Sequence, residues 1–176
     1  MSGAEIAQRP ALHARPHSPG TSVTIATRMA GLLSIMAGAM HAKAMADHVA
    51  HWWFFGVFFG VLACAQFAWG VRVYVGGAGD RLLLAGAAGS LVVVAIWIIS
   101  RVVGVPAGPW AGDAEPVGAM DLVASLDELV IVAFVAAALR PQGKGLGWLH
   151  GAHAVRLGIA LGTLSLFAAL VGGHSH

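Results

Sequence analysis

The residues best suited to chemistry occupy two stretches that lie far apart in the sequence. The first stretch, between Met40 and Phe59, carries imidazoles and one carboxylate: His41, Asp47, His48 and His51. The second stretch, between Gly112 and Leu129, carries only carboxylates: Asp113, Glu115, Asp121, Asp127 and Glu128. Imidazole and carboxylate ligands together suit copper, zinc or non-haem iron. If the two stretches meet in space, they predict a metal site or a buried polar core.

The composition indicates that these residues lie in a membrane protein. The chain has 176 residues, of which 58% are hydrophobic and 10% are charged, and its mean hydropathy is +0.79. Soluble domains carry about 25% charged residues. This chain therefore has too little polar surface to face water, and we expect the lipid bilayer to be its main partner. No basic patch is interleaved with aromatic residues, so a nucleic acid partner is not expected.

Hydrophobic runs predict the elements that position the polar residues. There are five such runs, at about 27–45, 52–74, 82–103, 117–139 and 152–171. Each is close to the roughly 20 residues that a helix needs to cross about 30 Å of hydrocarbon, and none alternates as a membrane strand does. The sequence predicts an all-α bundle of five transmembrane helices. Residues 1–22 are expected to form a disordered cytoplasmic tail, residues 23–173 one transmembrane domain, and residues 174–176 a short outer tail.

The first hydrophobic run admits a second interpretation. Its uninterrupted apolar part, Met29 to Met40, is short, and the small residues around Lys43 resemble a cleavage site. A cleaved signal peptide is therefore the alternative to a retained helix. Against cleavage, the segment before the apolar part is long, and cleavage would remove His41.

The basic residues predict the orientation of the bundle. If the N-terminus is cytoplasmic, every arginine and lysine except Lys43 and Arg101 falls on the cytoplasmic side, as the positive-inside rule requires. The expected location is the plasma membrane, with the C-terminus outside. This orientation places both polar stretches in the outward half of the bundle.

Depth in the membrane is the sharper signal for a site. Glu128 falls near the midpoint of its hydrophobic run, and Asp121 lies seven residues earlier, on nearly the same helical stripe. His41 and Arg101 also fall inside hydrophobic runs. A charge near the bilayer centre costs about 2.5–3.5 kcal/mol even on lenient scales, so these side chains are expected to face inward and meet. Asp127 points about 100° away from Glu128, and Glu128 is favoured because it shares the stripe of Asp121.

The leading hypothesis is a transition-metal site, with copper first and then iron or zinc. Its predicted ligands are His41, His48, Asp121 and Glu128, and the weaker candidates are Asp47, His51 and Glu115. Arg101 would balance charge or hold the Gly104–Pro109 loop as a lid. No specific metal motif occurs, so whether the protein is an enzyme stays open. A catalytic version would be a metal-dependent oxidoreductase or hydrolase.

Two alternatives accompany the metal hypothesis. In the first, the polar cluster is structural: Arg101 pairs with Glu128 or Asp121, His41 bonds to a neighbour, and the protein is a non-enzymatic membrane subunit or scaffold. In the second, Glu128 is the titrating group of a proton-coupled transporter. A homo-oligomer or a partner subunit is compatible with each hypothesis.

Part of the chain resembles a known group of proteins. The resemblance rests on Asp47 to Gly56, on Arg101 to Pro109, and on the following Glu115-Pro116-Val117-Gly118 and Asp121-Leu122. These stretches are similar to small bacterial multi-helix membrane proteins that have no assigned activity. The resemblance spans about residues 41–139 and implies that these residues form one unit.

Overall fold

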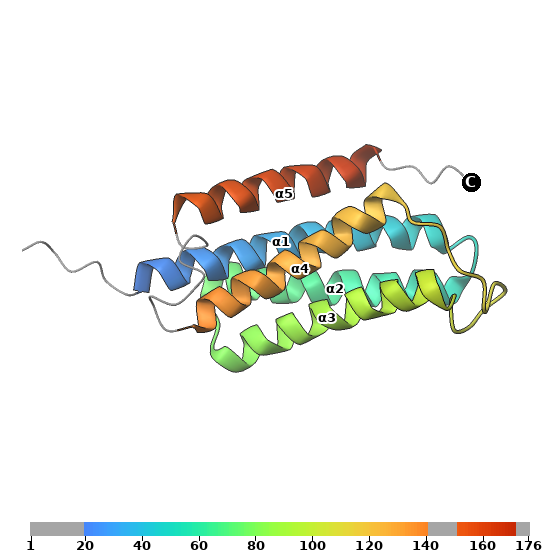
Figure 1. Cartoon of the computed structure of the whole chain (residues 1–176), viewed down its shortest axis with the longest axis horizontal. Helices are drawn as coiled ribbons and strands as arrows, with labels where there is room; N and C mark the ends of the chain where they lie inside the picture. Colours follow the sequence, from blue (N-terminus) through green and yellow to red (C-terminus); the bar gives the residue numbers. More distant parts are fainter. Residues whose placement is uncertain (1–19, 141–150, 172–176) are drawn as a thin grey trace, which may run out of the picture.

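The computed structural model describes residues 20–140 and 151–171, and the side chains from residue 25 onward. It contains five α-helices: α1 (Gly20–His48), α2 (Trp53–Gly76), α3 (Asp80–Val102), α4 (Ala119–Leu139) and α5 (Ala152–Val171). Figure 1 shows them side by side as a bundle. No strand occurs in the part of the chain that is described, so the predicted all-α class is confirmed. All five helices are long and apolar enough to cross a membrane.

The first helix is longer than the sequence predicts. It begins at Gly20, inside the predicted tail, and continues through Lys43 and Asp47 to His48. Lys43 Nζ and Asp47 Oδ2 are 2.9 Å apart, four residues apart on the helix. Because these charges neutralise each other on one face, they do not end the helix. Most of the predicted tail, residues 1–19, and the predicted outer tail, residues 174–176, lie outside the described residues.

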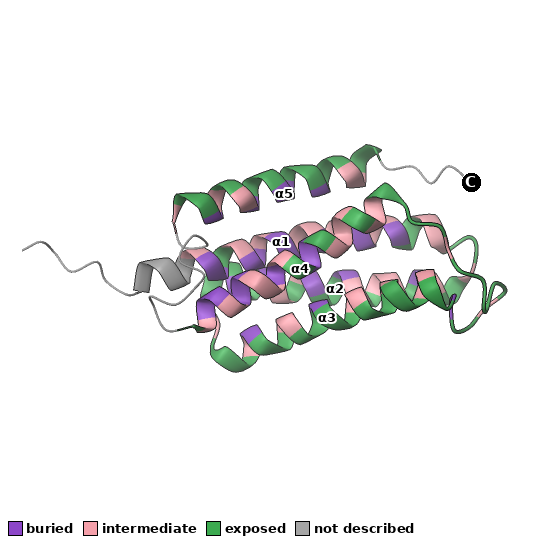
Figure 2. Ribbon diagram, viewed as in Figure 1, coloured by how far each residue is buried: buried purple, intermediate pink, exposed green. Residues whose placement is uncertain are grey.

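Helix α1 is the centre of the bundle. It packs against α2, α4 and α5, whereas α3 packs against α4. Figure 2 shows buried residues concentrated on α1 and α4, and exposed residues on the outer sides of α2, α3 and α5. The exposed sides carry large apolar residues such as Val61, Leu91 and Phe167, as expected of helices that contact lipid. The run that could have been a cleaved signal is therefore the helix against which three others pack.

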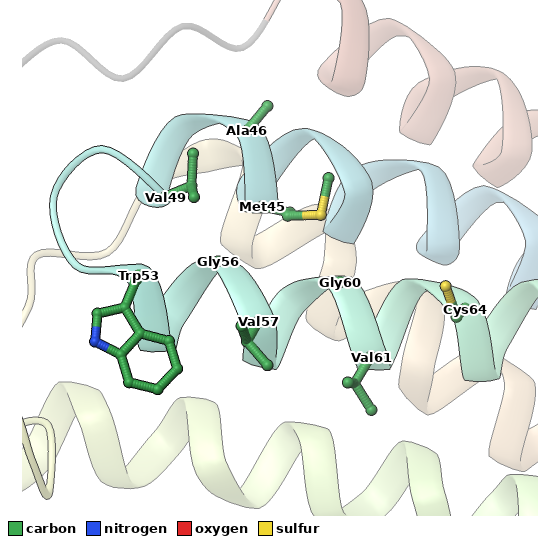
Figure 3. Close-up of a pocket in the computed structure, with 9 residues that line it drawn as sticks. All are labelled: Met45, Ala46, Val49, Trp53, Gly56, Val57, Gly60, Val61 and Cys64. Atoms are coloured by element: carbon green, nitrogen blue, oxygen red, sulfur yellow. The ribbon is translucent and has the colours of Figure 1, made fainter.

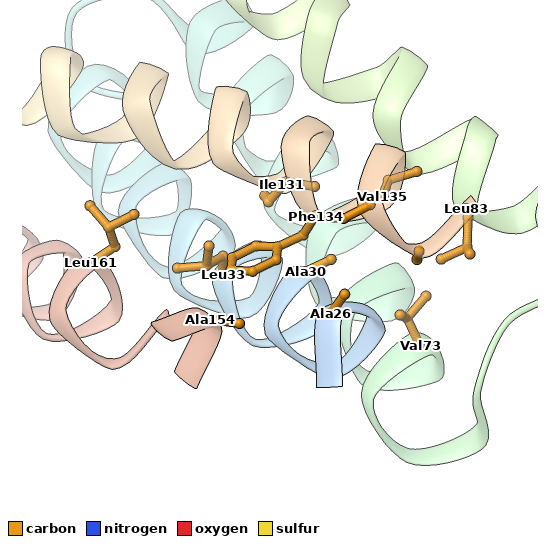
Figure 4. Close-up of a cluster of buried hydrophobic side chains, with 12 residues drawn as sticks. Ala26, Ala30, Leu33, Val73, Leu83, Ile131, Phe134, Val135, Ala154 and Leu161 are labelled. Carbon is orange, nitrogen blue, oxygen red and sulfur yellow. The ribbon is translucent and has the colours of Figure 1, made fainter. Parts of the chain in front are cut away.

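The hydrophobic core fills one half of the bundle. Figure 4 shows that it is built around Phe134 and Ile131 of α4, which lie against Leu33 and Ala30 of α1 and Leu161 of α5. Small residues on α1 let the larger α4 side chains approach its backbone. This apolar core lies toward the end of the bundle where α2 ends at Gly76. We call that end the Gly76 end and the opposite end the His48 end.

Glycines set the close approach of α1 and α2. A Cβ atom added to Gly70 would lie 2.7 Å from the carbonyl oxygen of Gly31, and one added to Gly31 would lie 2.8 Å from that of Gly70. Neither position has room for a side chain. The two backbones are therefore held in direct contact, as small residues allow between membrane helices.

Candidate functional site

A chain of hydrogen bonds crosses the interior of the bundle from α1 to α4. His41 Nδ1 lies 2.8 Å from Gln66 Oε1 on α2 and 2.9 Å from the Ala37 carbonyl oxygen. Both partners only accept, so Nδ1 carries the proton. Gln66 Nε2 donates to Glu128 Oε1 on α4. The network thus joins His41, Gln66 and Glu128 from three helices.

The Glu128 carboxyl group is fully enclosed, with a relative exposure of 0%. The buried Ser90 hydroxyl of α3 also lies beside this Glu128 carboxyl group. Its second oxygen, Oε2, has no hydrogen-bond partner among the described residues. Polar side chains of α2 and α3 therefore lie beside one carboxyl group of α4, whose second oxygen is unsatisfied.

Asp127, next to Glu128, is also fully buried and contacts a different helix. The Ser165 hydroxyl of α5 donates to Asp127 Oδ2 and also lies 2.8 Å from the Leu161 carbonyl oxygen. Asp127 Oδ1 has no partner among the described residues. The 100° rotation between Asp127 and Glu128 was expected to leave Asp127 outside the site. Asp127 does point away from the Glu128 network, and because α4 has neighbours on several sides, it is buried against α5.

Arg101 belongs to a separate ionic group at the His48 end. Its Nη2 donates to Asp121 Oδ2 at 2.7 Å, and its Nη1 donates to Glu115 Oε2. Asp121 Oδ2 also accepts a hydrogen bond from the Gly118 backbone N–H at 3.1 Å, and the Asp121 carboxylate thereby caps the start of α4. Within the described residues, Arg101 thus pairs with Asp121, one of the two expected partners, and not with Glu128.

The loop between α3 and α4 covers the His48 end. Gly112 N–H donates to the Val105 carbonyl at 3.0 Å, which folds the loop back on itself. Gly108 has a φ of 102° and packs on Trp52, whose ring would lie 2.7 Å from an added Cβ atom. Arg101 holds the far side of this loop through Glu115.

The outer histidines are separated from the buried network. The Nδ1 atoms of His48 and His51 lie 2.8 Å and 3.0 Å from the carbonyl oxygens of Ala44 and Asp47. The Phe59 ring lies 5.1 Å from the ring of His48 and 6.0 Å from that of His41, between centroids. His51 follows α1 in a turn, so it does not continue the helical face of His48.

The predicted ligands therefore divide between different surroundings. His41 and Glu128 share the buried network, Asp121 pairs with Arg101, and His48 lies beyond Phe59. Within residues 20–140 and 151–171, no group of three or more His, Cys, Asp or Glu side chains is arranged to hold a metal ion. The transition-metal hypothesis stays a prediction.

A surface groove of about 580 Å³ lies between α1 and α2 near the His48 end. Figure 3 shows its lining, which runs from Val49 and Trp53 to Cys64 and is almost entirely apolar. None of the network residues lines it. We assign this groove to the lipid-facing surface.

Three neutral polar residues of the site were missed by sequence reasoning, which considered only ionisable groups. They are Gln66, Ser90 and Ser165, and all are buried. Gln66 carried a usable signal, because an amide inside an apolar membrane helix needs a hydrogen-bond partner from another helix. The serines gave none, since a serine in a membrane helix can bond to its own backbone.

The fold and the site together define a multi-pass α-helical membrane protein with a buried carboxyl network. Comparison with known proteins found no match to a protein-family model, a curated protein or a solved structure. The resemblance to small bacterial membrane proteins therefore stays a prediction.

Proposed function

We propose that the bundle is a proton-coupled membrane transporter or transport subunit in which Glu128 takes up and releases the proton. The observation that carries this proposal is the full burial of Glu128 in the middle of α4, where its hydrogen bond comes from a neutral amide. Ionisable groups in such positions are typical of proton relays.

The surroundings of Glu128 suit a group that changes its charge. Gln66 connects it to His41, so two titratable side chains are joined through one neutral amide. Asp127 adds a second buried carboxyl group on the same helix. A proton gained or lost at Glu128 therefore changes the hydrogen-bonded network that includes α1 and α2.

The unsatisfied oxygens favour this function over a purely structural cluster. A network kept only for stability gains most when every buried polar group is bonded. Both Asp127 Oδ1 and Glu128 Oε2 lack partners among the described residues. A carboxyl group that has to exchange protons needs an oxygen that is open to a proton donor.

Proton flux into liposomes tests the proposal. Purified protein in potassium-loaded liposomes is given a potassium diffusion potential, and an enclosed dye reports internal pH. We expect Glu128→Gln to reduce the flux to that of protein-free liposomes. Asp80→Asn removes an exposed carboxylate far from the network and should leave the flux unchanged. Equal flux through the wild type and Glu128→Gln would exclude Glu128 as the carrier.

Metal binding is the second candidate, with copper first and then iron or zinc. In its favour, His41, His48 and His51 each hold Nδ1 against a backbone carbonyl oxygen, which is how metal-binding histidines are oriented. Elemental analysis of tag-free protein tests this candidate. About one equivalent of metal, lost in His48→Ala, would support it, and a protein that takes up neither copper nor zinc would exclude it.

The orientation belongs to the same proposal. We place the protein in the plasma membrane with its N-terminus in the cytoplasm, so that the His48 end faces outward. This assignment is supported by the basic residues in the described part of the chain. Only Lys43 and Arg101 lie toward the His48 end, whereas the other five lie toward the Gly76 end: Arg28, Arg72, Arg81, Arg140 and Arg156.

A further inference from the structure

Unsatisfied polar atoms recur along the contact between α3 and α4. Trp97 Nε1, Arg101 Nε and Glu128 Oε2 are all buried and have no hydrogen-bond partner among the described residues. Two of these atoms are donors and one is an acceptor. In the apolar part of a membrane, each unsatisfied polar group costs several kcal/mol, so their common position calls for an explanation.

The three atoms belong to one seam between the helices. Ser90, Trp97 and Arg101 are spaced by seven and four residues, so they share one stripe of α3. The ends of this stripe contact α4, because Arg101 pairs with Asp121 and Ser90 lies beside Glu128. Trp97, between them, therefore faces α4 as well. We call this contact the polar seam.

The polar seam reaches from the His48 end to the middle of the membrane. Ser90 and Arg101 are eleven residues apart, which corresponds to about 16 Å along a helix and to roughly half of the hydrocarbon thickness. Beyond Ser90 the same stripe continues with Leu83, which lies near Val135 of α4 in the hydrophobic core, as Figure 4 shows. The seam is thus polar on one side of Glu128 and apolar on the other.

The three unsatisfied atoms determine which kind of molecule can occupy the polar seam. An anion would suit Arg101 and Trp97 but would oppose the Glu128 carboxyl group, and a cation would oppose Arg101. An apolar molecule would leave all three atoms unsatisfied. Water both donates and accepts hydrogen bonds, and buried water typically bonds polar groups that lack protein partners.

We infer that water enters the bundle beside Arg101 and follows the polar seam to Glu128, while the apolar core closes the path toward the Gly76 end. That the polar seam is the proton entry route rests on the proposed function, but the hydration of the seam does not. Glu128 is then in contact with the solution at the His48 end only.

Cysteine accessibility tests the hydrated seam. Ser125 lies four residues after Asp121 and three before Glu128, on the α4 stripe that borders the seam. In a Cys64→Ala background, Ser90→Cys and Ser125→Cys place thiols at the deep and the shallow part of the seam. Leu91→Cys and Leu126→Cys are matched controls, because each lies one residue further along the same helix and is exposed to lipid. A charged, membrane-impermeant thiosulfonate reacts only with thiolates, which form in water and not in lipid.

We expect both seam cysteines to react at least about tenfold faster than their lipid-facing controls, because only they are hydrated. Ala107→Cys in the exposed outer loop gives the rate of a fully accessible thiol. If the seam cysteines are as slow as the controls while Ala107→Cys reacts, the hydrated seam is excluded. If Ser90→Cys does not fold, Ser125→Cys against Leu126→Cys decides. Reactive seam cysteines in a protein without proton flux would support the seam and refute the transport function.

Discussion

Gln66 is the residue whose replacement most directly tests the buried network. Gln66→Leu removes the hydrogen bonds to His41 and to Glu128, so that the Glu128 carboxyl group loses its partner on α2. Hydrogen bonds between membrane helices contribute about 0.6 kcal/mol on average and up to about 1.7 kcal/mol. Loss of both should lower the free energy of unfolding by about 1–3 kcal/mol.

A double-mutant cycle separates this effect from a change in packing. In a Glu128→Leu background, Gln66→Leu removes only the bond to His41, so its cost should fall to about 0.6 kcal/mol. The assay is reversible unfolding in mixed detergent micelles, followed by helical circular dichroism. The neighbouring exposed position supplies the control, since Ala65→Leu should change stability by less than about 0.5 kcal/mol. Equal costs of Gln66→Leu in both backgrounds would refute the coupling between Gln66 and Glu128.

Three further predictions use the same protein. Gly70→Ala should destabilise the bundle by about 1–3 kcal/mol in the same unfolding assay, because the new methyl group meets the α1 backbone. The control Gly89→Ala should not destabilise it, because a Cβ atom there meets nothing within 4 Å. Arg101→Met should cost about 1–3 kcal/mol because it leaves two carboxylates unpaired. Lys43→Met should cost about 0.5 kcal/mol or less, because Lys43 forms one ion pair within a single helix and is more exposed than Arg101. Equal costs would contradict the role given to Arg101. Intact-mass spectrometry of membrane-extracted protein should find α1 retained, and a mature chain that begins at Met45 or Asp47 would show that the bundle forms without this helix.

The number and type of the helices could be predicted because they depend on local properties of the sequence. A membrane helix satisfies its own backbone and needs only sufficient length and apolarity. The ends of the helices were less predictable. The early start of α1 at Gly20 and its passage through Lys43 and Asp47 depend on packing and on a local ion pair, and neither has a hydropathy signature.

The candidate site was predicted in part. His41 and Glu128 were selected because ionisable residues at membrane depth are expected to face inward, and the structure joins them in one network. Their connection through Gln66 could not be predicted, because the rotation of α2 about its own axis decides which of its side chains reaches α4. For the same reason, the contact of Asp127 with Ser165 depends on the position of α5.

The sequence by itself determined that this is a membrane protein of five helices with ionisable residues at depth, since transfer into lipid acts on each segment separately. The tertiary structure alone decided which polar groups share an interior. It placed Arg101 with Asp121 and Glu115 at one end, and left Glu128 to a neutral amide in the middle. Such pairings depend on the relative rotation and depth of packed helices, and these are set by contacts between side chains distant in sequence, such as Gly31 with Gly70.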